Sequence, residues 1–459
     1  MFYDLVRSSS SMPSAKVMSV EQEDSFELPS KIPLIKTTIP GEKSKKILAE
    51  QKELETSTVI YPKSFPIAIK RAQDSVIEDE DGNYFIDWVT GISVLNLGHS
   101  NLIRNAISTQ LSKVWHTLEV PSETRVEFMK ELRKSFPANM KNYKTMFGIT
   151  GADACETAIN LAHTVSGIKA STVAFEGAYH GVHGGVITAT AGRAYKTPVF
   201  SGGMSIIRAP YPYEMWYDYD TSDTLSFLEK VVNDSEAGYE KPDSLIVEPI
   251  QGEGGYIVPP DGFLKALREF CDKNDVIMII DEVQTGLGRT GKMWGFEWDS
   301  IKPDIICISK SIGGGIPLSV VYYREDYDPK LPIPFHLGTY RGNALALAAG
   351  AAVLKEIPKY LDRVRSEGSD LQKRFGRIGS PLIADVRGRG FMIGIELAEN
   401  QKPVSKTKML SMKHTMLSKG LMMHTCGHFG NVFRFMGALN IPSEYLRTGV
   451  GIFGESLGS

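Results

Sequence analysis

Short runs of consecutive apolar residues alternate with amphipathic segments over much of the chain, from about residue 145 to residue 325. Five runs have the length of strands and are rich in β-branched residues: 172–175, 244–247, 276–280, 304–309 and 318–323. Because apolar residues follow one another in these runs instead of alternating with polar ones, both faces of each strand are expected to be buried. The pattern predicts an α/β fold with a mostly parallel sheet covered by helices.

The segment between the second and third runs predicts one of the covering helices. Residues 261–274 place Phe263, Leu267 and Phe270 on one face at helical spacing. Asp261 follows two prolines at the start of this segment, a position where an aspartate side chain can accept from the first free N–H groups of a helix. We therefore expect Asp261 to be the N-cap.

The two ends of the chain carry a different pattern. Strand-like stretches at 68–72, 75–78 and 84–88 surround a turn at 79–83, which is a hairpin signal. At the other end, a helix at 344–357 precedes strand-like stretches at 384–386, 392–396 and 432–441 and a final helix. We expect a smaller α+β domain made from both chain ends. The expected boundaries are 1–45 for an N-terminal arm, 46–104 and 346–459 for the two parts of the small domain, and 105–345 for the large domain.

Composition narrows the class of protein. The chain has 459 residues, 42% hydrophobic and 23% charged, with a formal net charge of −3, which is typical of a globular protein and gives no reason to expect a nucleic-acid or membrane partner. No run approaches the roughly 18 apolar residues of a membrane helix. The four cysteines are far apart and form no CxxC motif. They predict reduced, buried thiols in a cytoplasmic protein.

Polar residues stand directly after four of the apolar runs. Ligands of parallel α/β sheets bind outside the carboxyl ends of the strands, so we expect these residues to surround one crevice. Lys310 follows the run at 304–309 and is itself followed by three glycines at 313–315. A lysine held in a crevice with its ammonium group partly desolvated can form a Schiff base with an aldehyde. Lys310 is therefore the main catalytic candidate.

An aldehyde cofactor such as pyridoxal 5'-phosphate also needs an acid at its pyridinium nitrogen, an aromatic ring on its face and a site for its phosphate. Asp281 follows the run at 276–280 and suits the acid, while Tyr179 follows the run at 172–175 and suits the stacked ring.

The phosphate site is expected at the start of a helix. Thr150 and Asp153 resemble a capping box ahead of an amphipathic segment at 154–165. Gly151 and Ala152 would then lie in the first helical turn, where small residues leave backbone N–H groups open to an anion.

Two other motifs suggest different chemistry and are set aside. The residues at 286–291 match GxGxxG, but an aromatic-rich stretch without helical period follows them, whereas a dinucleotide site opens a helix there. His424, Cys426 and His428 are metal-ligand residue types, but no further cysteine or histidine stands nearby. We expect neither a dinucleotide nor a metal.

Ordered motifs along about 32–438 carry a family resemblance. They are DGNYFID at 81–87, NLGH at 96–99, TGADA at 150–154, YHG at 179–181, EPIQGEGG at 248–255, DEVQTGLGRTG at 281–291, GTYRGN at 338–343 and RGRG at 387–390. Together with Lys310 they resemble the class III (ω-amino-acid type) pyridoxal-phosphate-dependent aminotransferases of fold type I. The resemblance implies pyridoxal 5'-phosphate as the cofactor, amino acids and 2-oxo acids as substrates, and a homodimer or a dimer of dimers.

The resemblance also implies a role for each candidate. Lys310 would hold the cofactor as a Schiff base and carry a proton between the substrate Cα and the cofactor C4′, Asp281 would pair with the pyridinium nitrogen, and Tyr179 would stack on the ring. The further cofactor contacts implied are Gly151 and Ala152 at the phosphate, His180 and Glu248 on the Tyr179 side, Val283 on the other ring face, Gln284 near the phenolic oxygen, and Thr339 at the phosphate of the neighbouring subunit.

Three residues are implied as substrate contacts. Arg434 matches the arginine that binds an α-carboxylate, Glu253 matches the glutamate that pairs with it when an ω-amino substrate is bound, and Ile92 matches an apolar pocket residue. Val182 stands where enzymes for 4-aminobutyrate or ornithine usually have an arginine for a distal carboxylate. An apolar residue there lacks the charge-assisted bond, so we expect substrates with a distal carboxylate to be disfavoured.

One alternative chemistry stays open. The stretch at 32–43 resembles an archaeal branch of the family that includes amino-acid racemases. Racemisation uses the same cofactor and returns the proton to Cα instead of C4′, so the scaffold serves both. The sequence therefore favours an aminotransferase that moves an amino group from an amino acid or ω-amine to a 2-oxo acid, such as 2-oxoglutarate, with a racemase as the alternative.

Overall fold

The computed structural model describes residues 27–167, 171–196 and 203–458. The chain divides into two units, residues 1–31 and 32–459, and every element named below belongs to the second. Most of the N-terminal arm expected at 1–45 lies outside the described residues, up to residue 26.

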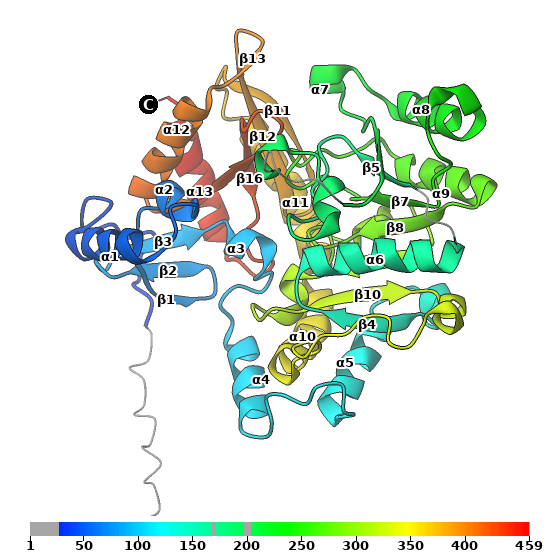
Figure 1. Ribbon diagram of the computed structural model, residues 1–459. Helices are drawn as coiled ribbons and strands as arrows, with labels where there is room; N and C mark the ends of the chain where they lie inside the picture. The colour runs from blue at the N-terminus through cyan, green and yellow to red at the C-terminus, as the bar shows by residue number, and fades with distance from the viewer. Residues whose placement is uncertain (1–26, 168–170, 197–202, 459) are drawn as a thin grey trace, which may run out of the picture. The chain divides into compact units, whose positions relative to one another are not determined.

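A seven-stranded sheet forms the centre of the larger part of the fold (Figure 1). Its order is β4 (Lys144–Gly148), β10 (Ser319–Tyr323), β9 (Ile305–Ile308), β8 (Ile277–Asp281), β7 (Ser244–Val247), β5 (Thr172–Phe175) and β6 (Ile206–Ala209). All pairs are parallel except the two that involve β10. The prediction of a mostly parallel sheet is therefore confirmed.

Helices cover both faces of this sheet. Helix α6 (Gly151–Ser166) packs against β7, β8, β9 and β10, and its buried residues share a core with Ile279 and Cys307. Neighbouring residues in a strand point to opposite faces of the sheet. Phe175 of β5 points to the face opposite α6, where its ring meets that of Phe263 of α9 (Phe263–Asn274) at 6.2 Å between centroids. Asp281 shares the α6 face with Ile279 and stands at the end of β8.

The start of α9 corrects one prediction. Gly262 is the N-cap residue, with a φ of 85°, and Asp261 instead forms an ion pair with Arg389. The Asp299 side chain instead accepts hydrogen bonds at the start of the helix, and its Oδ2 lies 2.8 Å from the amide nitrogen of Leu264. A side chain more than 30 residues away thus replaces the expected local cap.

Two further sheets are present. The first combines strands from both parts of the chain, in the order β1 (Ile69–Gln73), β2 (Val76–Asp79), β3 (Tyr84–Asp87) and β14 (Leu421–Met422). The second has the order β11 (Ile383–Arg389), β12 (Met392–Glu399), β16 (Val432–Phe435) and β15 (His424–Cys426), and β13 (Lys402–Pro403) pairs with β12. Strand β14 pairs parallel with β3. The strand expected over 432–441 ends earlier, at Phe435.

The remaining helices cover these sheets and connect them. They are α1 (Glu42–Leu54), α2 (Tyr61–Ser64), α3 (Thr90–Ser93), α4 (Asn101–Leu111), α5 (Glu123–Lys134), α7 (Glu214–Tyr217), α8 (Thr221–Asn233), α10 (Ala344–Glu356), α11 (Leu361–Gly376), α12 (Lys406–Ser418) and α13 (Ser443–Ser456). Helix α10 packs against α4 and α5. Among the described residues, we find no helix with the length and apolar character needed to cross a bilayer.

Candidate active site

Lys310 stands just past the carboxyl end of β9, at the edge of the large sheet. Its φ is 47°, in the left-handed region that non-glycine residues rarely adopt, so the chain bends sharply there. Burial lowers the pKa of Lys310, although the negative charges of Asp281, Glu253 and Glu248 act in the opposite direction. A lowered pKa increases the fraction of free amine, the form that attacks a carbonyl carbon.

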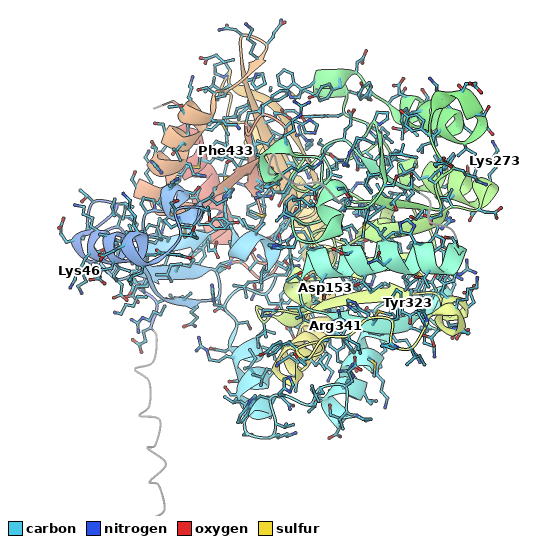
Figure 2. All side chains as sticks on the ribbon, viewed as in Figure 1. Lys46, Asp153, Lys273, Tyr323, Arg341 and Phe433 are labelled. Carbon is cyan, nitrogen blue, oxygen red and sulfur yellow. The ribbon has the colours of Figure 1, made fainter. Side chains whose placement is uncertain are left out.

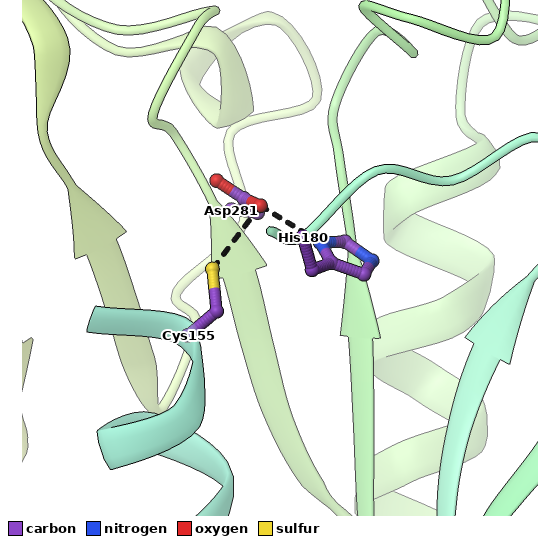
Figure 3. A group of neighbouring side chains, drawn as sticks. All are labelled: Cys155, His180 and Asp281. Carbon is purple, nitrogen blue, oxygen red and sulfur yellow. Dashed lines mark hydrogen bonds and ion pairs between the residues drawn. The ribbon is translucent and has the colours of Figure 1, made fainter. Parts of the chain in front are cut away.

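Asp281 accepts hydrogen bonds from two side chains (Figure 3) and from one backbone amide. His180 Nδ1 lies 2.7 Å from Asp281 Oδ2, and the thiol of Cys155 on α6 donates to the same oxygen at 3.3 Å. The backbone N–H of Val283 donates to Oδ1 at 3.0 Å. These donors hold the carboxylate in place at the end of β8.

The same three side chains lie close enough together to be considered as a metal site. A cysteine binds metal as a thiolate, however, and the pKa of Cys155 is raised well above its usual value by its hydrogen bond with Cys307, by burial and by the charge of Asp281. The protonated thiol is a donor to Asp281. The cluster is therefore a hydrogen-bonded support for the carboxylate.

The start of α6 is open to an anion. Thr150 caps the helix by accepting from the Asp153 amide at 3.1 Å, as the sequence predicts. A Cβ on Gly151 would lie only 3.0 Å from a Val283 methyl carbon, and a Cβ on Gly181 would lie 2.4 Å from Ala152. Glycine at both positions therefore allows the loop after Tyr179 and the segment after β8 to approach the helix start closely.

An open pocket of about 340 Å³ adjoins this helix start and is lined in part by Thr150, Ala152 and Asp153. Figure 2 shows Asp153 near Arg341, and the closest charged atoms of this pair are 3.6 Å apart. His336 also lies 3.4 Å from Asp153.

Glu248 supports the loop that carries Tyr179. Its carboxylate accepts from the Tyr179 amide at 2.9 Å and from the Gly252 amide at 2.8 Å. Burial raises the pKa of Glu248 to about 7. The Tyr179 ring meets Tyr195 edge-on at 5.3 Å between centroids, and the Gln284 side chain lies against Gly252.

Arg434 and Glu253 form a close ion pair. Arg434 NH1 lies 2.6 Å from Glu253 Oε1, and the arginine side chain is only 2% exposed. Burial raises the pKa of Glu253, but the charge and the hydrogen bond of Arg434 lower it overall. Both residues act on the pKa of Lys310, so the pair belongs to the same site.

Ile92 lies in a strained segment. Thr90, Ile92 and Ser93 have φ values of 47°, 62° and 61°, and the side chain of Ile92 packs against a core that contains Phe65. Such strain persists only where surrounding packing holds it, and it concentrates at functional sites.

Thr339 is the candidate that the structure does not bring to the others. It is exposed, and the hydrogen bond we find for it among the described residues joins its carbonyl oxygen to His116 Nε2 at 2.8 Å.

Several residues of this region were not singled out from the sequence. They are Cys155 beside Asp281, Tyr195 beside Tyr179, and Tyr61, Lys413 and His424 near Arg434. In the sequence, His424 stands out only as part of a metal-like motif. Its pairing with Arg434 across strands β15 and β16 gives no signal in the sequence.

Comparisons with known proteins agree on one family. A model of the class-III aminotransferases matches residues 60–457. The chain is 33% identical over 419 residues to diaminobutyrate–2-oxoglutarate aminotransferase of Rhizobium meliloti (strain 1021), covering 86% of this chain and 88% of the relative. It is 35% identical over 413 residues to 4-aminobutyrate aminotransferase of Mycobacterium leprae (strain TN), covering 86% and 92%. Ornithine aminotransferase of Toxoplasma gondii ME49 has the same fold, with a TM-score of 0.78, 25% identity and coverage of 91% and 96%.

The residues present fit pyridoxal 5'-phosphate, the cofactor of this family. The α6 start adjoins an open pocket in which its N–H groups could take a phosphate, and Asp281 is held at the end of β8, where it could accept from a pyridinium N–H. His180 Nε2 is buried without a hydrogen-bond partner among the described residues, so this cluster retains a free polar atom. The chain belongs to the class-III aminotransferases, enzymes that use pyridoxal 5'-phosphate to transfer amino groups to 2-oxo acids.

Proposed function

We propose that this aminotransferase moves the amino group of an ω-amino acid or a related amine to 2-oxoglutarate, with Lys310 as the catalytic amine. The observation that carries the proposal is that Lys310, at the end of β9, is close enough to Asp281 and to the Arg434–Glu253 ion pair for all three charges to act on its pKa. The named activities of the diaminobutyrate and 4-aminobutyrate relatives support this choice of substrates.

Pyridoxal 5'-phosphate, when bound, supplies an aldehyde for amines and a ring that accepts electrons from the bond broken at the substrate Cα. Asp281, which Cys155 and His180 keep oriented, would pair with the ring nitrogen. Lys310 would carry the proton to and from the substrate Cα. Tyr179 would stack on the ring and Val283 would pack on its other face, while Gly151 and Ala152 would hold the phosphate through backbone N–H groups.

Arg434 and Glu253 let one site accept two kinds of substrate. When the substrate has an α-carboxylate, Arg434 binds it. When an ω-amine without that carboxylate occupies the site, Glu253 keeps the buried arginine paired, as at the 2.6 Å distance of the structure. Leaving Arg434 unpaired would carry a large desolvation cost.

The enzyme acts as a homodimer in which Thr339 reaches the phosphate site of the other subunit. The support is an exposed apolar surface beside Thr339, made of Trp115, Leu118, Val120, Leu337 and Tyr340, each at least half exposed. Surfaces of this kind mark protein–protein contacts. The four free, buried cysteines support a reducing compartment, so we place the enzyme in the cytoplasm.

Borohydride trapping tests the role of Lys310. Reduction of the holoenzyme followed by peptide mapping should place the pyridoxyl group on the Lys310 peptide, and Lys310→Ala should leave no fixed cofactor. A pyridoxyl group on another lysine would refute the assignment.

A half-reaction distinguishes transamination from racemisation, an alternative that finds no support in the family model or the relatives. Adding 4-aminobutyrate or 2,4-diaminobutyrate without a 2-oxo acid should bleach the yellow absorbance in one turnover, and 2-oxoglutarate should restore it. Persistent absorbance with loss of the chirality of 2,4-diaminobutyrate would favour a racemase.

A further inference from the structure

Lys413 is a buried lysine near the active site. It lies on α12 among the buried residues Met409, Met412 and Met416, and it is only 4% exposed. Lysine is almost never buried this completely without a pairing group, because moving its ammonium out of water is costly. Its position therefore needs an explanation.

No negative charge of the structure compensates Lys413. In residues 27–167, 171–196 and 203–458, no carboxylate lies within ion-pair distance of its Nζ. Nζ donates to Ser64 Oγ at 3.0 Å and lies 5.7 Å from the centre of the Phe65 ring. An ammonium group has three donors, so one hydroxyl and one ring face leave capacity for an anion.

Lys413 is linked to Arg434 through two rings. The Phe65 ring lies 5.8 Å from the His424 ring, and His424 pairs directly with Arg434 across strands β15 and β16. Burial and the charge of Arg434 lower the pKa of Lys413 to about 8, so the two cations act on each other. Since Glu253 already pairs with Arg434, one positive charge in this region remains uncompensated.

His424 adds a neutral ring beside Arg434. Its Nδ1 lies 2.8 Å from both the amide nitrogen and the carbonyl oxygen of Thr425, so the backbone occupies Nδ1. Burial, with the charges of Arg434 and Lys413, lowers the pKa of His424 to about 3, which keeps the ring neutral. Its Nε2 is buried and has no partner among the described residues, and neither does Arg434 Nε.

We propose that Lys413, beside Arg434 and the His424 ring, forms a subsite for the carboxylate at the far end of the substrate, so that this enzyme takes donors and acceptors with two separated polar ends. The inference rests on the proposed transaminase function and names its substrate class. A carboxylate supplies the missing negative charge and accepts from Lys413 Nζ. Tyr61, which is half exposed and meets the His424 ring at 5.7 Å, borders the subsite toward solvent.

This subsite gives a distal carboxylate the cationic partner that an apolar residue at position 182 does not. An expectation based on Val182 alone disfavours substrates with a distal carboxylate. The cationic group is instead supplied by Lys413 of α12. If Lys413 binds the distal carboxylate, wild type should prefer 4-aminobutyrate to butylamine.

The test compares two donors that differ only in the carboxylate. For wild type, Lys413→Met, Lys413→Arg and the control Lys406→Met, an exposed lysine on the same helix, kcat/KM is measured for 4-aminobutyrate and for butylamine. Loss of one charge-assisted hydrogen bond corresponds to roughly a ten- to hundred-fold loss of affinity. Lys413→Met should lower the ratio of kcat/KM for 4-aminobutyrate to kcat/KM for butylamine by at least about ten-fold. Lys413→Arg and Lys406→Met should keep a ratio close to that of wild type.

A binding measurement keeps the test independent of turnover. Glutarate, a dicarboxylate that cannot react, is titrated into each holoenzyme by calorimetry, and its affinity should fall for Lys413→Met. An unchanged donor ratio together with unchanged glutarate affinity would overturn the subsite. If wild type transaminates neither donor and shows no half-reaction with any amine, the proposed function fails instead, so the two failures are distinguishable.

Discussion

Replacing Lys413 with methionine should make the protein more stable at neutral pH. The pKa of Lys413 falls from 10.5 to about 8 on folding, mainly because of burial. At about 1.36 kcal/mol for each unit, this corresponds to a cost of roughly 3 kcal/mol for keeping the lysine charged in the folded protein. Methionine removes that cost and fits among the apolar side chains of α12. Loss of the Ser64 hydrogen bond offsets about 1 kcal/mol, so the net gain at pH 7 is about 2 kcal/mol.

The gain should depend on pH in a definite direction. Because the folded pKa of Lys413 lies below the unfolded value, the unfolded chain binds more protons between pH 8 and pH 10.5. The stability of wild type therefore rises with pH across this window relative to that of the variant. At pH 10 the remaining cost is about 1 kcal/mol, and the advantage of Lys413→Met should disappear.

Thermal unfolding of wild type, Lys413→Met and the exposed control Lys406→Met, at equal concentrations and at pH 7 and pH 10, measures both effects. With an unfolding entropy of about 2.1 cal/mol/K per residue, a gain of about 2 kcal/mol raises Tm by roughly 2 °C at pH 7. A variant less stable than wild type at pH 7, or a difference that does not change with pH, would refute the idea that Lys413 is a charge held at a cost to folding.

Four other substitutions test the site. Asp281→Asn should lower kcat by about 100-fold or more and should weaken cofactor binding, measured by absorbance titration, because the ring nitrogen loses its anionic partner. Gly151→Leu should raise the Kd for pyridoxal 5'-phosphate with far-UV dichroism unchanged, since a side chain there meets Val283. Glu253→Gln should raise KM for amines without an α-carboxylate at least about ten-fold more than KM for 2-oxoglutarate, because Arg434 is left unpaired. Trp115→Asp should shift the sedimentation of the protein toward the monomer with loss of activity; an active monomer would contradict the dimeric site.

The central sheet and its catalytic edge could be predicted because their signals are local. Apolar runs marked β5 and β7 at the residues where the structure has them, since strands buried on both faces are mostly apolar and the two polar residues, Thr172 and Ser244, bond to each other. Parallel strands end at one edge, so polar residues after separate runs, such as Asp281 and Lys310, had to approach one another.

The features that sequence reasoning missed depend on contacts between distant segments. Asp299 caps α9 from a separate loop, which displaced Asp261 from that role. Lys413 comes from helix α12 and His424 from strand β15, and their functional character lies in what surrounds them. A lysine on an amphipathic helix gives no sequence signal that distinguishes a solvated ammonium from a buried one.

The parallel pairing of β3 with β14 has a consequence for how the chain is made. Ile86 faces Leu421 in this pairing, so the two partners are separated by roughly 330 residues. At about 5–20 residues per second, the N-terminal hairpin waits roughly 20 to 70 s on the ribosome before its neighbouring strand exists. During that interval one side of β3 exposes unpaired backbone groups, the kind of edge that invites pairing with other chains. Completion of the sheet that contains β3 and β14, and formation of strand β16, which carries Arg434, are therefore among the last events of synthesis.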